Sequence, residues 1–131
     1  MILNNNYYVT ESVLCGHPDK ICDQISDAIL DEYLKGDRNS HTAIECMGFQ
    51  NNIILAGEVD SHAELNVVDI AKKVYKEIGY ENELNVQSYI SKQSYQLACA
   101  VKTGGAGDQG IMYGYACNNN YNYLPIGIYV A

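Results

Sequence analysis

Positive charge is scarce in this sequence. Lysine and arginine together number 8, against 16 aspartates and glutamates, so the formal net charge is −8, and Arg38 is the only arginine. Proteins that bind nucleic acid need a basic surface that neutralises phosphates. The composition therefore argues against a nucleic-acid partner.

Long apolar runs and paired cysteine motifs are also missing. No stretch approaches the roughly 18 apolar residues that span a membrane, and residues 1–6 lack the basic start and the apolar core of a signal peptide. The 5 cysteines are odd in number and form no Cys-x-x-Cys pair, which argues against a zinc site or a disulfide framework. These absences predict a protein of the cytoplasm with no membrane partner.

The most informative segment is Gly-His-Pro-Asp-Lys at residues 16–20. Pro18 suits the first position of a helix, because its missing N–H is not needed there. His17 then lies near the cap and Asp19 in the first turn. A helix N-terminus offers free N–H donors and partial positive charge, which suit a phosphate or a carboxylate–metal pair. In the alternative interpretation, Asp19 only complements the helix dipole.

Hydrophobic periodicity predicts an α+β fold. The predicted elements are a short strand at 7–9, a helix over 18–35, a hairpin of strands 42–49 and 53–59, a helix over about 66–78, a strand at 84–90, and strands at 111–117 and 124–130. Gly36, with a positive φ, and Gly79 are expected to end the two helices, and Ser61 with Glu64 has the spacing of a capping box. This order predicts a single domain over 1–131, with two layers and the helices on one face of a mixed or antiparallel sheet.

Two recurrent residue types have open interpretations. Aspartates recur every four residues at 19, 23, 27 and 31, which describes either a metal-binding stripe or, more commonly, a solvated helix face. The 12 tyrosines suit either a protein interface or the packing of a core and a sheet.

Two long motifs carry a resemblance to a known family. Residues 10–28, which include Thr-Glu-Ser-Val before the 16–20 segment, closely resemble the opening of S-adenosylmethionine synthetases. Residues 105–116, Gly-Ala-Gly-Asp-Gln-Gly-Ile-Met-Tyr-Gly-Tyr-Ala, are similar to the glycine-rich hexapeptide and the following strand of the same family. Weaker similarities at Glu45 and at 56–58, 78–80 and 92–94 keep the family's order. The resemblance spans roughly the N-terminal third of a family member, and the family's later motifs, with their basic phosphate contacts, are not recognised.

The resemblance implies a methionine adenosyltransferase that joins ATP and methionine and releases pyrophosphate and phosphate, with Mg²⁺ and K⁺ as cofactors. It assigns catalytic roles to His17 and Lys20, a magnesium contact to Asp19, a potassium contact to Glu45, and substrate contacts to Glu11, Glu58, Gln93 and Asp108. An exposed strand glutamate is the alternative for Glu45, and a turn residue is the alternative for Glu58. The loop from Tyr95 to Gly104 is shorter than the family's gating loop.

Two hypotheses follow from the resemblance and the charge. In the first, the chain is the small subunit of a split S-adenosylmethionine synthetase, and a second, more basic chain supplies the phosphate-binding lysines and arginines; a homo-oligomer through the uncovered sheet face is the other form of partnership. Little of the charge on a triphosphate is matched here, which motivates this hypothesis. In the second, the chain is a non-catalytic module that regulates a synthetase or binds methionine or adenosyl compounds.

Overall fold

The computed structural model describes residues 7–94, 99, 104–106, 109–119 and 121–131. The chain divides into two compact units, Leu14–Gly107 and a second unit formed by Met1–Val13 with Asp108–Ala131. The first unit contains the regular elements α1 (Pro18–Gly36), β1 (His41–Phe49), β2 (Asn52–Asp60), α2 (Val67–Ile78) and β3 (Asn85–Lys92), and the second contains α4 (Ile126–Val130).

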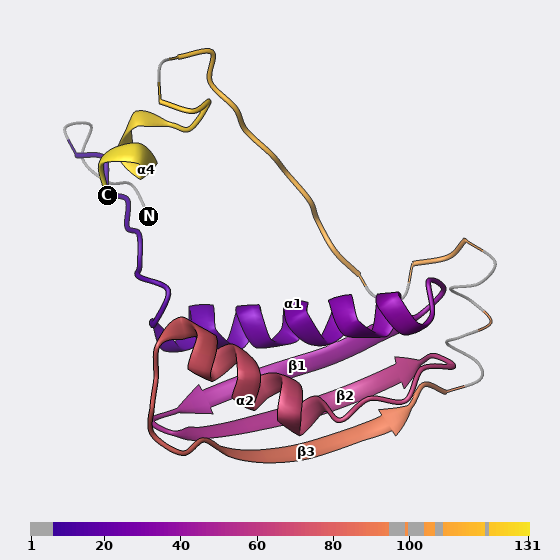
Figure 1. Ribbon diagram of the computed structural model, residues 1–131. Helices are drawn as coiled ribbons and strands as arrows, with labels where there is room; N and C mark the ends of the chain where they lie inside the picture. The colour runs from indigo at the N-terminus through magenta and orange to yellow at the C-terminus, as the bar shows by residue number, and fades with distance from the viewer. Residues whose placement is uncertain (1–6, 95–98, 100–103, 107–108, 120) are drawn as a thin grey trace. The chain divides into compact units, whose positions relative to one another are not determined.

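The sheet of the first unit has the order β1-β2-β3. β1 pairs with β2 antiparallel, as a hairpin whose register joins Phe49 to Asn52. β2 pairs with β3 parallel. A parallel pair needs a crossover connection, and α2 provides it between β2 and β3. Figure 1 shows α1 and α2 covering one face of this mixed sheet, which confirms the predicted α+β fold with two layers.

The helices form where the sequence pattern predicts them. Both begin with a side-chain cap, His17 for α1 and Asn66 for α2. α2 ends at Gly79, whose φ of 114° is available to glycine at little cost. The Gly79 N–H donates to the Lys76 carbonyl, and the Tyr80 N–H donates to the Tyr75 carbonyl. This pair of bonds is the Schellman arrangement, which places the ring of the residue after the glycine near the last helical turn.

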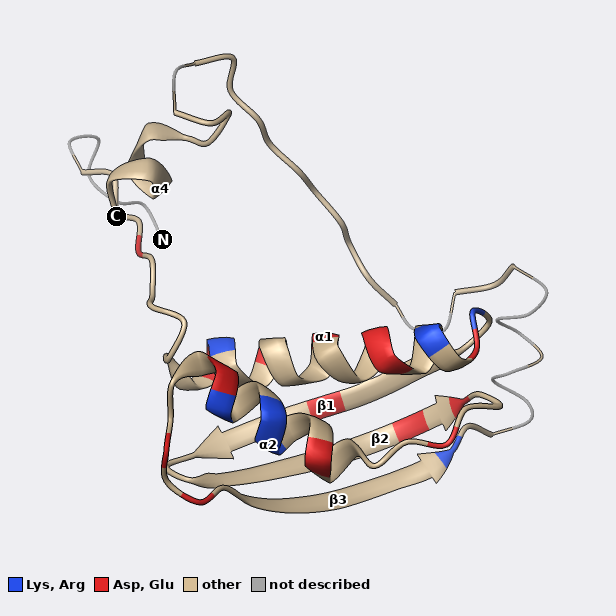
Figure 2. Cartoon of the chain, viewed as in Figure 1, with Lys and Arg blue, Asp and Glu red and all other residues tan. Residues whose placement is uncertain are grey.

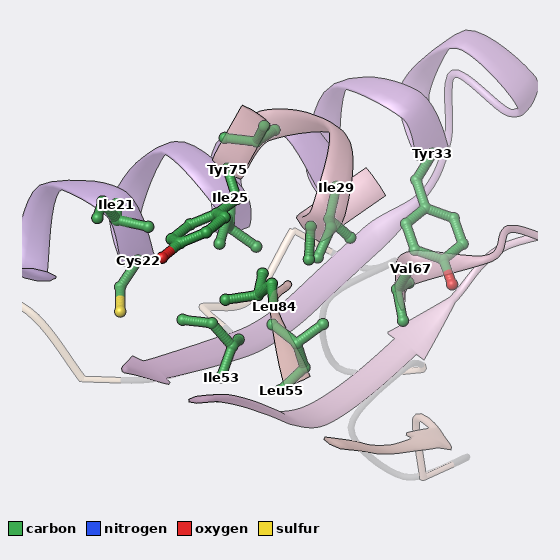
Figure 3. Close-up of a cluster of buried hydrophobic side chains, with 12 residues drawn as sticks. Ile21, Cys22, Ile25, Ile29, Tyr33, Ile53, Leu55, Val67, Tyr75 and Leu84 are labelled. Atoms are coloured by element: carbon green, nitrogen blue, oxygen red, sulfur yellow. The ribbon is translucent and has the colours of Figure 1, made fainter. Parts of the chain in front are cut away.

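The core lies between the helices and the sheet (Figure 3). Ile25, Ile29 and Leu55 are fully buried. The complete cluster consists of Ile21, Cys22, Ile25, Ile29, Tyr33, Ile53, Leu55, Val67, Ala71, Val74, Tyr75 and Leu84. On α1 the buried positions recur at three- and four-residue intervals, whereas Leu34, which the periodicity placed on the same face, is 36% exposed.

Several local predictions are wrong. Gly36 is the last residue of α1 without a positive φ, because Asp37 turns the chain in an extended conformation and donates its N–H to the Tyr33 carbonyl. The Ser61–Glu64 capping box does not form. Ser61 instead accepts from the Ala63 N–H and shares a hydrogen bond with Ser40, while Asn66 caps α2.

The predicted strands outside the first unit are also wrong. Residues 7–9 and 111–117 have no regular secondary structure, and 126–130 form α4 instead of a strand. The apolar and aromatic run of residues 111–117 resembles a strand, but residues 111–116 are all exposed in the structure. Strands need a neighbouring strand to satisfy their N–H and C=O groups.

Candidate functional site

His17 forms the N-cap of α1. Its Nδ1 accepts a hydrogen bond from the Asp19 backbone N–H at 3.2 Å, and Pro18 occupies the first helical position. A neutral imidazole that accepts on Nδ1 carries its proton on Nε2. The half-buried ring therefore keeps one N–H donor for an anionic group near the helix N-terminus, where the helix dipole also favours negative charge.

Asp19 and Lys20 lie in the first turn of α1, and both are exposed. The other three aspartates of the stripe, Asp23, Asp27 and Asp31, are exposed as well. Within the described part of the chain, no group of three or more histidine, cysteine or acidic side chains could hold a metal ion. Magnesium is commonly held by one or two carboxylates together with substrate phosphates. The single Asp19 carboxylate fits that role, and the stripe fits a solvated face.

The turn before α1 is held by two side chains that the sequence did not identify. Gln24 Nε2 donates to the Cys15 carbonyl at 3.1 Å, and Tyr80 Oη donates to the Gly16 carbonyl at 2.9 Å. The ring of Tyr80 stacks on Tyr75, with centroids 4.6 Å apart and planes 12° apart. Tyr80 belongs to the 78–80 segment of the family resemblance, which was the one signal in the sequence that pointed to it.

Glu45 and Glu58 lie on the sheet face opposite the helices. The β1–β2 register pairs Glu45 with Ala56 and Glu58 with Ala43, so the two carboxylates are diagonal neighbours on this face. Glu45 is exposed and Glu58 is half-buried. We call this surface the open face; it also includes Met47, Phe49 and Tyr89, which are 65%, 73% and 65% exposed.

Gln93 follows directly after β3. Its backbone N–H donates to the Val59 carbonyl at 2.9 Å, which extends the ladder past the pair of Glu58 with Ser91. Its side-chain oxygen is buried and has no hydrogen-bond partner among the described residues. A buried acceptor without a partner is costly to the fold. Gln93 thus lies at the same end of the sheet as Glu58. The side-chain oxygen of Gln93 is a hydrogen-bond acceptor that no described residue uses.

The His17 turn lies at the other end of the sheet. A cleft of about 430 Å³ brings Gly16 and Pro18 beside Gly48, Gln50 and the rest of the β1–β2 turn. The opposite end of α1 meets the end of β2, where Ser40 Oγ donates to the Tyr33 carbonyl and contacts Ser61. Six residues of β2 separate Asn52 from Glu58, which is roughly 20 Å along a strand. His17 caps α1 beside the β1–β2 turn and Glu58 lies near the other end of β2, so the structure does not bring the two together within one chain.

The remaining candidates are placed less fully. Glu11 is exposed and belongs to the second unit, and Asp108 lies outside the described residues. Basic and acidic residues both occur along α1 and α2 (Figure 2). The described residues that line the 430 Å³ cleft carry no charge.

Two thiols lie in or beside the core between α1 and the sheet, Cys22 on the helix and Cys46 on β1. Burial is the main cause that raises the pKa of both, and it raises the pKa of Cys46 to about 12. Cys15, in contrast, is exposed in the turn before His17. All five cysteines are free.

Known proteins resemble this chain over most of its length. The family model described as "S-adenosylmethionine synthetase, N-terminal domain" matches residues 5–103, and the model for the central domain of the same synthetase matches residues 103–131. The second match shows that the chain also reaches into the family's central domain, which the motifs did not reveal. No helix in the described residues is both long and apolar enough to cross a membrane.

Individual relatives agree with these matches. The S-adenosylmethionine synthase of Mycoplasmopsis synoviae is 49% identical over 127 residues, which cover 92% of this chain and 33% of the relative. That of Borrelia garinii subsp. bavariensis is 45% identical, with 92% and 35% covered. A solved structure titled as an unusual S-adenosylmethionine synthetase from Campylobacter jejuni has a TM-score of 0.73 and 35% identity, and covers 87% of this chain and 32% of that one. The chain thus spans about a third of the length of these relatives.

Proposed function

This chain belongs to the S-adenosylmethionine synthetase family, and from that premise we propose that it forms part of a methionine adenosyltransferase. In the proposed reaction, the sulfur of methionine attacks the ribose C5′ of ATP and the triphosphate leaves, followed by its hydrolysis to pyrophosphate and phosphate. The other basic groups that bind the triphosphate come from outside these 131 residues, in our proposal from a second, more basic chain.

The His17 end serves the triphosphate. Negative charge develops on the oxygen that leaves C5′, and a fixed N–H donor stabilises such charge best where water is excluded. The Nε2–H of His17 is this donor, and the Asp19 N–H bond to Nδ1 fixes its direction. Lys20 adds one positive charge in the same turn. Asp19 would hold Mg²⁺, which neutralises phosphate charge when bound.

The Glu58 end serves methionine. The ammonium group of an amino acid needs oxygen acceptors, and Glu58 offers a half-buried carboxylate. The unpartnered oxygen of Gln93 lies next along the same end of the sheet and offers a neutral acceptor. Glu11 and Asp108 are proposed as further substrate contacts on the resemblance alone. Glu45 would contribute one carboxylate oxygen to a K⁺ site, whose other ligands would have to come from other groups.

The observation that carries the proposal is the separation of these two ends. His17 and Glu58 lie near opposite ends and on opposite layers of one unit, so a site that uses both must draw them from two chains. The open face supplies a surface for such a contact, because Met47, Phe49 and Tyr89 are apolar or aromatic and largely exposed. The second, more basic synthetase-like chain is the proposed partner on this face.

The test begins with the tagged chain purified from its own host and examined by native mass spectrometry. We expect a complex with another chain and, in that complex, formation of S-adenosylmethionine from ATP and methionine. His17→Ala or Asp19→Ala should lower turnover by about 100-fold or more without changing assembly. Asp27→Ala is the matched control, since Asp27 is an exposed aspartate of the same helix two turns further on. Full activity of both His17→Ala and Asp19→Ala would show that the motif is only a helix start.

A binding module remains the second candidate, and one observation favours it. Glu58 and Gln93, the proposed methionine contacts, lie at the same end of the β2–β3 pair. Binding of methionine to them requires no phosphate contact. Titration of the lone chain with methionine separates the two candidates. Saturable binding that Glu58→Gln abolishes, without any turnover in the assembled complex, would favour the module over the enzyme.

A further inference from the structure

In the turn that presents His17, three successive backbone carbonyl groups all accept hydrogen bonds. The Leu14 carbonyl accepts from the His17 N–H at 2.9 Å. The Cys15 carbonyl accepts from Gln24, and the Gly16 carbonyl accepts from Tyr80. Gln24 comes from α1 itself, whereas Tyr80 comes from 64 residues further along the chain. Tyr80 is thus the group that connects this turn to the second helix.

The position of Tyr80 is itself tightly determined. Its backbone follows Gly79 in the Schellman arrangement at the end of α2, and its ring lies on that of Tyr75, which is only 4% exposed. A Cβ on Gly16 would lie 2.8 Å from Tyr80 Oη, too close for any real side chain. The turn therefore fits closely around the tyrosine hydroxyl, and residue 16 has no room for a side chain.

From this geometry we propose that Tyr80 is a positioning residue for His17. Tyr80, just after the end of α2, donates a hydrogen bond to the Gly16 carbonyl and so fixes the turn before α1. The turn fixes the backbone of the cap residue His17, and the hydrogen bond from the Asp19 N–H to Nδ1 orients its imidazole. The inference deepens the proposed function, because the direction of His17 matters to catalysis only if His17 contacts substrate. The structural part of the inference stands whether or not the chain proves to be an enzyme.

The test compares two conservative variants of one stacked pair. Tyr80→Phe removes the bond to Gly16 and keeps the ring, while Tyr75→Phe removes an equivalent hydroxyl whose bond goes to Asn82 Oδ1 at 3.2 Å. Amide hydrogen exchange and imidazole nitrogen shifts are measured by NMR on the full chain. Loss of one hydrogen bond should speed exchange of the His17 amide about fivefold in Tyr80→Phe. In Tyr75→Phe the exchange rate of this amide should stay within about twofold.

A double-mutant cycle supplies a second, independent measurement. Gly16→Ala should lower the melting temperature strongly in the wild-type background. With Phe at position 80 the nearest ring carbons stand 3.5 Å from the new Cβ, an ordinary contact, so Gly16→Ala should then cost less. Additive effects of the two changes would overturn the inference, as would unchanged exchange at His17 in Tyr80→Phe.

Kinetics of the assembled complex separate positioning from general stability. Tyr80→Phe should lower kcat and raise KM for ATP by several-fold, while KM for methionine stays at its wild-type value. Equal effects of the Tyr80 and Tyr75 variants would reduce Tyr80 to a stability role. If no form of the complex makes S-adenosylmethionine, the proposed function fails, and the NMR and melting data still decide whether Tyr80 positions His17.

Discussion

The two faces of the β1–β2–β3 sheet carry different residues, although these alternate along the same strands. Toward the helices lie Ile53 and Leu55, which are 3% and 0% exposed. Toward the open face lie Met47, Phe49 and the carboxylates of Glu45 and Glu58. One face thus holds the fold together, and the other carries candidate ligand contacts and an apolar surface suited to another chain. The comparison teaches that, under the proposed function, the residues for stability and those for ligand contact occupy alternate positions of the same strands.

The largest effect on stability is expected where the covered face is deepest. Leu55→Ala should lower the free energy of unfolding by about 3 kcal/mol, because it removes fully buried methyl groups and leaves a cavity. Met47→Ala, at 65% exposure on the open face, should change it by less than about 0.5 kcal/mol. Urea unfolding followed by circular dichroism measures both values. Similar losses for the two variants would mean that the open face is as important to the isolated chain as the core.

Patterns in the sequence predicted the parts of the fold that depend on local burial. α1 and α2 have apolar residues at helical spacing, and the β1–β2 hairpin joins two apolar runs around Gln50 and Asn51. In these elements the sequence pattern itself indicates which residues are buried. Residues 111–117 are a similar apolar run, yet they form no strand. Whether a strand forms depends on a neighbouring strand to pair with, which one segment's pattern cannot reveal.

The same limit applies to the candidate site. The cap position of His17 follows from Pro18 and was predictable from five adjacent residues. The bond from Tyr80 to Gly16 joins positions 64 residues apart, and the unpartnered oxygen of Gln93 depends on what surrounds it after folding. Neither has a local signature. The separation of His17 from Glu58 likewise required the strand register and the direction of α1.

A second prediction compares the thiol of Cys46, which lies under α1, with that of Cys15, which is exposed in the turn before α1. The thiolate is the reactive form, and a pKa of about 12 instead of 9.0 lowers the thiolate fraction of Cys46 about a thousandfold near pH 8. A thiolate of higher pKa is a better nucleophile, which offsets part of this loss. Cys46 should therefore react with iodoacetamide roughly 30- to 60-fold more slowly than exposed Cys15, before any further protection by burial.

Peptide mass mapping after timed alkylation measures both rates on the folded chain. In denaturant the two cysteines should react at similar rates, which controls for differences in the peptides themselves. Equal rates in the folded chain would contradict the packing of α1 over β1, because Cys46 lies under that helix.

The smallest effect on stability and the clearest effect on assembly are expected at Phe49. Its side chain is 73% exposed, so Phe49→Ser removes little burial from the isolated chain and should change the free energy of unfolding by less than about 0.5 kcal/mol. A partner that covers the open face would bury this ring, and burying a phenylalanine contributes about 1.5–3 kcal/mol. The dissociation constant of the complex should then rise at least about tenfold.

Sedimentation of the purified complex over a range of concentrations measures this constant, with Leu34→Ser as the control. Leu34 is 36% exposed on α1, so its replacement alters a surface apolar residue on the helix layer and should leave assembly unchanged. If Phe49→Ser assembles like the wild type, the partner does not use the open face. The carboxylates of Glu45 and Glu58 would then face solvent, and a site that joins them to His17 would lose its physical basis, because the chain alone holds the two ends apart.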